Sequence, residues 1–192
     1  GVMSGDRSYK RYLRPYLDMN NLNTYTDIYP NLMRGQQLMD AGIVEFTPGT
    51  TLDISKSEGF KQGLTYCVAP ITFGNTTLTT YDFWAVGMDC CSGSQPDFHC
   101  TGYTSTNFGG LRLMDSGARS LYRLAVQQAE ATYGIRAAHP LFFDWTHKPT
   151  KTVQQWQKTA YSQFIIWIVA YGIFQAFCVA CAALAFSRLG QV

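Results

Sequence analysis

The chain lacks the short motifs that define most enzyme sites. Its 192 residues contain no Gly-x-Ser-x-Gly, no His-Glu-x-x-His and no glycine-rich phosphate loop. Histidine is scarce, since only His99, His139 and His147 are present, each among aromatic neighbours. Gly109-Gly110 predicts a turn and not a nucleotide-binding fingerprint. The sequence therefore predicts a protein that is not an enzyme, with no catalytic residue and no required cofactor or metal.

Net charge is also small. The chain carries 15 Lys and Arg against 13 Asp and Glu, a net charge of +2. This balance argues against a nucleic-acid-binding protein, whose domains are strongly basic. The first residues show no charged segment followed by an apolar one, so no signal peptide is visible. We expect that a targeting segment was removed or that the sequence was trimmed.

One stretch lacks charge entirely and is the most informative part of the sequence. Residues 164–186 read FIIWIVAYGIFQAFCVACAALAF, in which Gln175 is the single strongly polar side chain. As a helix they extend about 35 Å, enough to cross ~30 Å of hydrocarbon. Trp156, Tyr161 and Trp167 flank the amino-terminal edge, as aromatic residues do at membrane interfaces. We predict one transmembrane helix, with a buried helix of a soluble core as the alternative.

The rest of the chain divides into an amino-terminal arm and a soluble domain. A basic, tyrosine-rich start and a polar run of Asn and Thr predict an extended arm. The rings of Tyr9, Tyr12 and Tyr16 suit contact with a partner, and a solvated tail is the alternative. The expected boundaries are 1–40 for the arm, 41–150 for the domain, and 151–192 for the membrane helix and a short tail.

Two β-hairpins are predicted early in the domain. The first pairs the β-prone run 43–47 with 52–55 across a Pro-Gly turn. The second pairs 64–72 with 78–88, two runs rich in β-branched and aromatic residues, across Gly74-Asn75.

Two helices are predicted outside the membrane. Residues 32–41 suit a short helix that ends at Gly42. A longer amphipathic helix is capped by Asp115 or Ser116 and ends at Gly134, with apolar residues at three- and four-residue spacing between them. The predicted fold class is α+β: a small β-rich, disulfide-stabilised domain with one amphipathic helix, followed by one carboxyl-terminal transmembrane helix.

Four cysteines of the domain predict two disulfides. Cys67, Cys90, Cys91 and Cys100 lie close together in a β-rich region tied to a membrane. A bond between the neighbours 90 and 91 is sterically awkward, which leaves 67–90 with 91–100, or 67–91 with 90–100. A zinc site that adds His99 and buried free thiols are the alternatives. Cys178 and Cys181 lie within the span, where thiols act as small apolar residues.

The span carries a pattern for helix packing. Gly172, Ala176 and Ala180 form a small-xxx-small face that permits close approach of another transmembrane helix. Gln175 lies beside this face near the bilayer centre, where an unpaired amide is costly. We expect it to bond to a neighbouring helix or water, or to ligate the magnesium of a chlorophyll as a possible pigment site.

Two signals disagree on which side of the membrane carries the domain. The positive-inside rule places it on the cytoplasmic or stromal side, because four basic residues precede the span and one follows it: His147, Lys148, Lys151 and Lys158, then Arg188. The cysteines favour the opposite, oxidising side, and we give them slightly more weight because translocated domains cross largely regardless of charge and these lysines are few.

Several longer segments resemble a multi-copy family of uncharacterised membrane proteins of dinoflagellate algae. The resemblance covers about residues 33–149 and rests on 65–71 (TYCVAPI), 82–93 (DFWAVGMDCCSG), 98–100 (FHC), 123–129 (RLAVQQA) and 139–143 (HPLFF). That family brings no known activity and no catalytic residue. It implies a thylakoid setting rich in chlorophyll and carotenoid.

The expected function is therefore that of a non-catalytic accessory subunit. The chain is expected to be an integral, single-pass membrane protein that contacts the lipid bilayer and other transmembrane subunits of a photosystem and its light-harvesting antenna. A surface or endomembrane receptor for a soluble ligand or glycan is the alternative, and a membrane-bound enzyme comes third. Co-purification with chlorophyll proteins separates the first two, and a pocket with perturbed titratable groups would favour the third.

Overall fold

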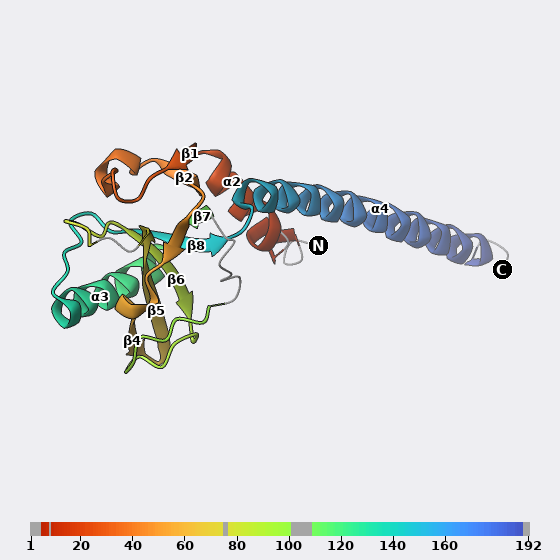
Figure 1. The fold of residues 1–192 in the computed structure, drawn as a ribbon. Coiled ribbons are helices and arrows are strands. Elements are labelled where there is room, and N and C mark those ends of the chain that lie inside the picture. The colour runs from red at the N-terminus through yellow and green to blue at the C-terminus, as the bar shows by residue number, and fades with distance from the viewer. Residues whose placement is uncertain (1–4, 8, 75–76, 101–108, 190–192) are drawn as a thin grey trace. The chain divides into compact units, whose positions relative to one another are not determined.

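The structure, a computed structural model, describes residues 5–7, 9–74, 77–100 and 109–189. It divides into two compact units (Figure 1). One unit is Leu17–Val153, and the other combines Gly1–Tyr16 with Gln154–Val192. The unit 17–153 contains all the strands, so it is the predicted α+β domain, with its start moved from residue 41 to residue 17.

The domain is built on an eight-stranded mixed sheet. Its strand order is β1-β2-β7-β8-β6-β5-β3, and β4 pairs with β5 beside this path. The strands are β1 (Asn23–Ile28), β2 (Ala41–Phe46), β3 (Thr50–Leu52), β4 (Glu58–Gln62), β5 (Leu64–Phe73), β6 (Phe83–Met88), β7 (Gly109–Arg112) and β8 (Leu141–Thr146). The helices are η1 (Tyr9–Leu13), α2 (Arg14–Asn20), η2 (Gly35–Leu38), η3 (Ile54–Lys56), α3 (Ser116–Tyr133) and α4 (Pro149–Leu189).

Helix α3 is the predicted amphipathic helix, and its ends are confirmed. Asp115 is the N-cap, and its carboxylate accepts hydrogen bonds from the N–H groups of Gly117 and Ala118. Gly134 ends the helix with a φ of 64°, in the left-handed region that suits glycine. The apolar stripe of α3 packs on one face of the sheet (Figure 1), against Trp84 and Phe142.

The other face of the sheet curls around an aromatic core. Phe46 of β2 and Phe83 of β6 are separated by two strands in the sheet order, yet their ring centroids lie 5.9 Å apart. Phe46 also packs edge-on against Phe143 and contacts Trp145, both on β8. Because side chains of a strand alternate between faces, Phe143 and Trp145 enter this core while Phe142 faces α3.

The amino-terminal segment differs from the predicted extended arm. Tyr9–Leu13 and Arg14–Asn20 are helical, and β1 pairs in parallel with β2. The predicted helix 32–41 is also wrong, because only Gly35–Leu38 form one 3-10 turn and β2 begins at Ala41. Gly42 is not a helix stop: a Cβ there would lie 2.6 Å from the Leu22 Cβ, so glycine lets the chain pass closely.

One predicted hairpin is confirmed and the other is wrong. β5 and β6 pair antiparallel from Pro70↔Trp84 to Tyr66↔Met88, although β6 is shorter than expected. Asn75 of the expected turn lies outside the described residues. The strands near 43–47 and 52–55 do not pair with each other, because β2 joins β1 and β7 while β3 joins β5. Partners distant in sequence outcompete the local turn here.

The predicted turn at Gly109-Gly110 is strand β7 instead. β7 lies between β2 and β8. A Cβ on Gly110 would lie 2.7 Å from the Phe143 Cβ, and one on Gly109 would lie 2.5 Å from the Pro149 ring. The two glycines therefore serve close packing in the sheet interior, a use of glycine that the sequence does not separate from a turn.

Candidate functional site

A crevice opens where two neighbouring parallel strands separate. β6 and β8 pair in parallel only over Phe83–Ala85 and Leu141–Phe143. Beyond this point β6 continues along β5 and β8 continues along β7. A cavity of about 850 Å³ lies at these carboxyl ends, lined by Val86, Gly87, Met88, Asp89, Cys90, Cys91, Ser92, Asp97, His99, Cys100, Asp144 and Trp145. In open α/β sheets ligands bind where the carboxyl ends of neighbouring parallel strands diverge, and β6 and β8 reproduce that local arrangement within a mixed sheet.

Two disulfides hold one wall of the crevice. Cys67 bonds to Cys91 and Cys90 bonds to Cys100, so the prediction of two disulfides is confirmed and its second pairing is the one present. The four sulfurs are consumed in these bonds, which rules out the alternatives of a zinc site and free thiols. Gly87 is required beside them, because a Cβ there would lie 2.2 Å from the Cys100 Sγ.

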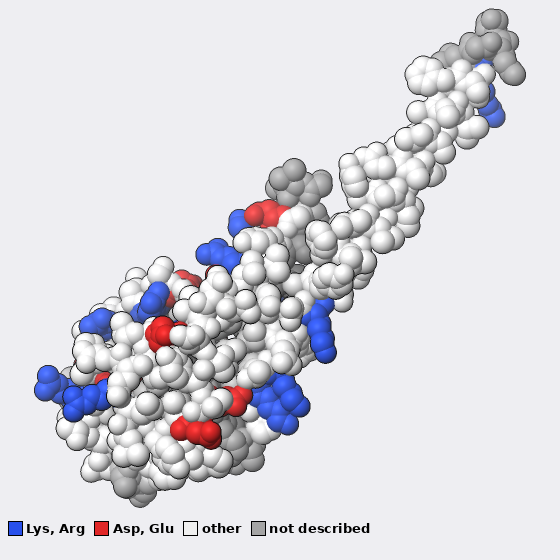
Figure 2. Space-filling model, turned by 90° about the horizontal axis from the view of Figure 1, so that it is seen from above, with Lys and Arg blue, Asp and Glu red and all other residues white. Residues whose placement is uncertain are grey.

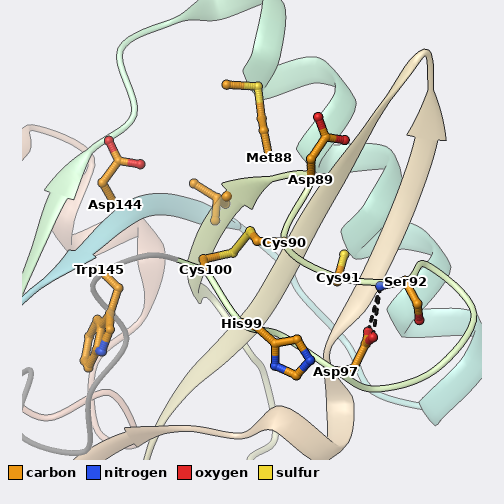
Figure 3. A pocket seen from close by; sticks show the side chains of 12 residues that line it. Met88, Asp89, Cys90, Cys91, Ser92, Asp97, His99, Cys100, Asp144 and Trp145 are labelled. Atoms are coloured by element: carbon orange, nitrogen blue, oxygen red, sulfur yellow. Dashed lines mark hydrogen bonds between the residues drawn. A yellow bond between two sulfur atoms is a disulfide. The ribbon is translucent and has the colours of Figure 1, made fainter.

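Two aspartates organise the loop that follows β6. Asp89 accepts a hydrogen bond from the Thr65 N–H at 2.8 Å, and its own N–H donates to the Thr65 carbonyl. Asp97 accepts the Ser92 N–H at 2.9 and 3.0 Å, drawn as dashed lines in Figure 3. Both carboxylates face the crevice while fixing the backbone around the disulfides.

Asp144 and Trp145 are consecutive on β8 and therefore reach the crevice from opposite faces of the sheet. In Figure 3, Asp144 lies on one side of the Cys90–Cys100 disulfide, and Trp145 and His99 lie on the other. The Asp144 side chain is exposed to solvent at the crevice, and the protein around it removes enough of its hydration to raise its pKa. Burial, followed by the charge of Asp144, raises the pKa of Tyr122 on the α3 side.

The indole nitrogen of Trp145 is a buried donor with no acceptor among the described residues. Trp145 is only 7% exposed, and its ring packs against Phe46 in the core. A buried N–H without an acceptor is unusual in a folded protein. The crevice thus combines carboxylates with one unsatisfied donor, which suits it for holding a polar ligand.

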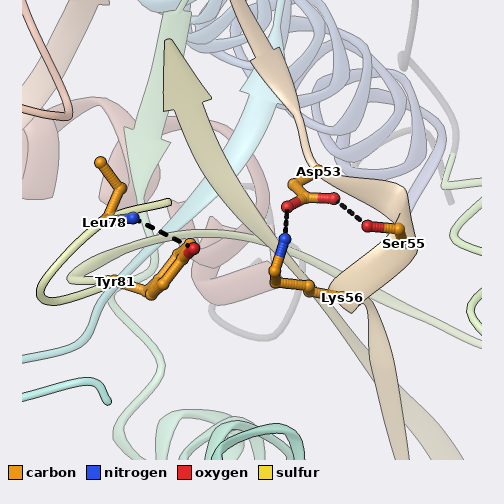
Figure 4. Close-up of polar contacts among 5 residues, drawn as sticks. All are labelled: Asp53, Ser55, Lys56, Leu78 and Tyr81. Atoms are coloured by element: carbon orange, nitrogen blue, oxygen red, sulfur yellow. Dashed lines mark hydrogen bonds and ion pairs between the residues drawn. The ribbon is translucent and has the colours of Figure 1, made fainter. Parts of the chain in front are cut away.

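A second polar cluster near the start of β4 is structural. Asp53 accepts hydrogen bonds from Ser55 and Lys56, and the Tyr81 hydroxyl accepts the Leu78 N–H (Figure 4). Burial opposes ionisation of Asp53, but the bonds from Lys56 and Ser55 outweigh it and lower the pKa of Asp53. The Lys56 ammonium also lies 5.8 Å from the Tyr81 ring centroid. These contacts join η3 to the segment before β6.

Helix α4 has the length and composition of a membrane span, as predicted. Among the described residues it is one helix that is long and apolar enough to cross a bilayer. From Pro149 to Gln163 it keeps a partly buried stripe, whereas every side chain described from Phe164 to Arg188 is exposed. Figure 2 shows this part of the helix as a surface without acidic or basic side chains until its far end. The change from a partly buried to a fully exposed helix therefore falls at Phe164, the predicted first residue of the span.

The predicted packing face of the span is open within this chain. A Cβ on Gly172 would meet nothing within 4 Å among the described residues, and Ala176 and Ala180 are exposed. Gln175 has a polar partner on its own helix, because its amide nitrogen donates to the Tyr171 hydroxyl at 2.5 Å. One of its two N–H donors is therefore satisfied without the neighbouring helix or pigment that we expected.

The tyrosines of the predicted arm are not gathered in the crevice. Tyr9 is about half exposed, Tyr16 is partly buried, and the Tyr12 side chain lies outside the described residues. Sequence reasoning found the cysteines that border the crevice but missed Asp144 and Trp145 as site residues. The segment HPLFFDWT carries no ligand motif, and only the pairing of β8 places these side chains beside β6.

No protein-family model matches this chain, and comparison with curated proteins and with solved structures gives no match.

Proposed function

We propose that the protein is a single-pass membrane protein that acts as a non-catalytic accessory subunit of a larger membrane assembly. The observation that carries this proposal is the exposure of α4: Phe164, Phe177 and Leu184 are 60%, 66% and 66% exposed. In water such a surface would drive association, whereas in a bilayer it is in contact with lipid or with other helices. The glycine face at Gly172 suits a helix partner.

A photosystem with its light-harvesting antenna, in a thylakoid membrane, is the assembly that we propose. The support is the resemblance of residues 33–149 to dinoflagellate membrane proteins, together with an apolar helix that presents aromatic rings to its surroundings. A chlorophyll or carotenoid would then contact the helix. The carbonyl oxygen of Gln175 could serve as a chlorophyll ligand, because the amide uses its nitrogen for Tyr171.

Purification of the protein in mild detergent tests this proposal. Native gels and absorption spectra should show chlorophyll proteins in the same particle. Gly172→Ile or Ala176→Ile should weaken retention in the particle, because added methyl groups hold the helices apart. Ala170→Ile is the matched control, since this residue lies about 160° around the helix from Gly172. Equal retention of all three variants, or a particle without pigment proteins, would contradict the proposal.

The amino-terminal segment is proposed as a second contact. Tyr9 keeps nearly half of its surface exposed on a helical segment with basic neighbours. Deletion of residues 1–16 removes no strand of the sheet, so the domain should stay folded while the complex loses the protein more easily. Unchanged retention would exclude the segment as a contact.

A receptor is the second candidate function, and the crevice between β6 and β8 favours it. A disulfide-bordered cavity next to a membrane span is the arrangement expected of a domain that meets a soluble ligand. A ligand that binds without any change in the assembly would support the receptor.

A further inference from the structure

We propose that the crevice between β6 and β8 binds a small organic cation that also carries a hydroxyl or carbonyl oxygen. This binding is separate from a role in assembly, because the crevice and the membrane helix are different surfaces. The crevice has a volume of about 850 Å³, which lies within the range of small-molecule sites.

The charge of the wall selects the sign of the ligand. Three aspartates line the crevice, Asp89, Asp97 and Asp144, against one histidine, His99, and no Lys or Arg. An anion would have to approach these three carboxylates with no Lys or Arg beside it, which is electrostatically unfavourable. An ammonium group would instead be attracted by the carboxylates.

Asp144 is the carboxylate that remains for the ligand. Asp89 and Asp97 already accept backbone N–H groups of Thr65 and Ser92. Asp144 accepts no hydrogen bond from the described residues and faces the cavity directly. The Asp144 side chain is exposed at the crevice, and the protein around it raises its pKa because no positive group offsets the loss of hydration. A bound ammonium group would supply that partner.

Trp145 supplies an independent reason to expect a ligand. It is also the reason why the ligand should carry a hydroxyl or carbonyl oxygen. Its indole N–H is more than nine-tenths buried at the cavity wall and finds no acceptor among the described residues. Phe46 packs against the indole at a centroid distance of 5.8 Å, and Trp145 is among the side chains that line the cavity (Figure 3). A hydroxyl or carbonyl oxygen of the ligand would accept this hydrogen bond.

A metal ion fits the crevice less well than an organic cation. Among the described residues, no three His, Cys, Asp or Glu side chains lie close enough together to hold a metal. Asp144 and Trp145 approach from opposite faces of the sheet, so a ligand must extend between them. A ligand that contacts both residues must therefore be a molecule with two separated polar ends.

Calorimetric titration of the full-length protein in detergent micelles tests the inference with three probes of one shape. They are trans-aminocyclohexanol, which is a cation, the neutral trans-methylcyclohexanol, and the anion trans-hydroxycyclohexanecarboxylate. The ammonium probe should bind at least about tenfold more tightly than the neutral one, since one opposite charge in a partly buried site is worth about this much. The anion should not bind. Equal affinities for the three probes would overturn the proposal.

Three variants locate the site. Asp144→Asn should remove the preference for the ammonium probe. Trp145→Phe keeps an aromatic ring but should weaken binding of both the ammonium and the neutral probe, because each uses its hydroxyl as an acceptor. Asp27→Asn is the control: it removes the same charge at an exposed position of β1, where φ is 57° and asparagine is tolerated. Unchanged binding in Asp144→Asn would overturn the proposal, even if Trp145→Phe failed to fold.

A lipid headgroup could present the same ammonium chemistry. Ethanolamine and phosphoethanolamine separate the two sources, because the headgroup form also carries a phosphate that the carboxylates should repel. Tighter binding of phosphoethanolamine would contradict a site for free organic cations. Retention of the protein in its membrane particle is measured separately, so failure of this inference leaves the proposed assembly role unaffected.

Discussion

The domain and the helix that follows it use similar apolar residues in opposite ways. Phe143 in the sheet is 0% exposed, whereas Phe177 in α4 is 66% exposed. In the domain, apolar side chains leave water by packing on one another from strands that are distant in sequence. In the helix they point outward all round, which is stable where the solvent is itself apolar. One chain is therefore built for two solvents.

The backbone follows the same division. Each strand of the domain needs a partner strand for its hydrogen bonds, and these partners are often far apart in the chain, as for β2 and β7. The helix satisfies its backbone groups internally, which is the condition for crossing hydrocarbon. Stability of the domain thus depends on tertiary packing, and that of the helix on its surroundings.

Paired phenylalanine substitutions should show the largest contrast. Phe143→Ala leaves a cavity between Phe46 and Phe83 and should lower the free energy of unfolding of the domain by about 3–5 kcal/mol. Phe177→Ala should change it by less than about 0.5 kcal/mol. Denaturant unfolding of the full-length protein in detergent, followed by near-ultraviolet circular dichroism, measures both. Similar losses in the two variants would show that the helix is part of the folded core.

Loss of a disulfide should be the next largest effect, and it should be confined to the domain. Each bond should contribute about 2–4 kcal/mol by restricting the unfolded chain. Cys67 and Cys91 are 24 residues apart and Cys90 and Cys100 are 10 apart. The double alanine variant of the first pair should therefore cost about 0.8 kcal/mol more than that of the second. The reverse order would show that native packing outweighs loop length. Replacement of Cys178 and Cys181, which are free, is the control.

The features that the sequence predicts well are those set by neighbouring residues. The ends of α3, the apolar span and the clustering of four cysteines depend on residues close in the chain, and the structure agrees with each. Hairpin 43–47 with 52–55 fails because β2 finds better partners in β1 and β7. Gly109-Gly110 fails because the need for space beside Phe143 is visible only in three dimensions.

The crevice lies beyond sequence reasoning for the same reason. The sequence predicts that its cysteines lie together, but it does not choose between two pairings that satisfy the same geometry. Asp144 and Trp145 become site residues only because β8 leaves β6 after Phe143. No local pattern records where two parallel strands separate.

The caps of α3 should have an intermediate effect. Asp115→Ala removes the acceptor for the N–H groups of Gly117 and Ala118 and should cost about 1 kcal/mol of domain stability. Asp115→Asn, which keeps a side-chain oxygen at the cap, should restore most of it. Gly134→Ala should cost a similar amount, about 1 kcal/mol, because φ is 64° at that position. Thermal unfolding of the three variants measures these differences, and an unaffected Asp115→Ala would show that packing on the sheet alone fixes the helix start.

The smallest predicted effect concerns the charge of Asp144 and appears as a dependence on pH. Burial raises the pKa of Asp144 in the folded protein, so the folded state holds this proton more tightly than the unfolded chain does. The group therefore contributes stability below its unfolded pKa, and this contribution is lost as the pH rises through the higher folded pKa. Asp144→Asn should slightly stabilise the domain at neutral pH, by no more than about 0.5 kcal/mol because the carboxylate still meets water, and should flatten the fall in stability between acidic and neutral pH. Urea midpoints measured across that pH range for Asp144→Asn and for the control Asp27→Asn test this prediction. Identical pH profiles of the two variants would mean that the Asp144 carboxylate is as well hydrated as one on the open surface.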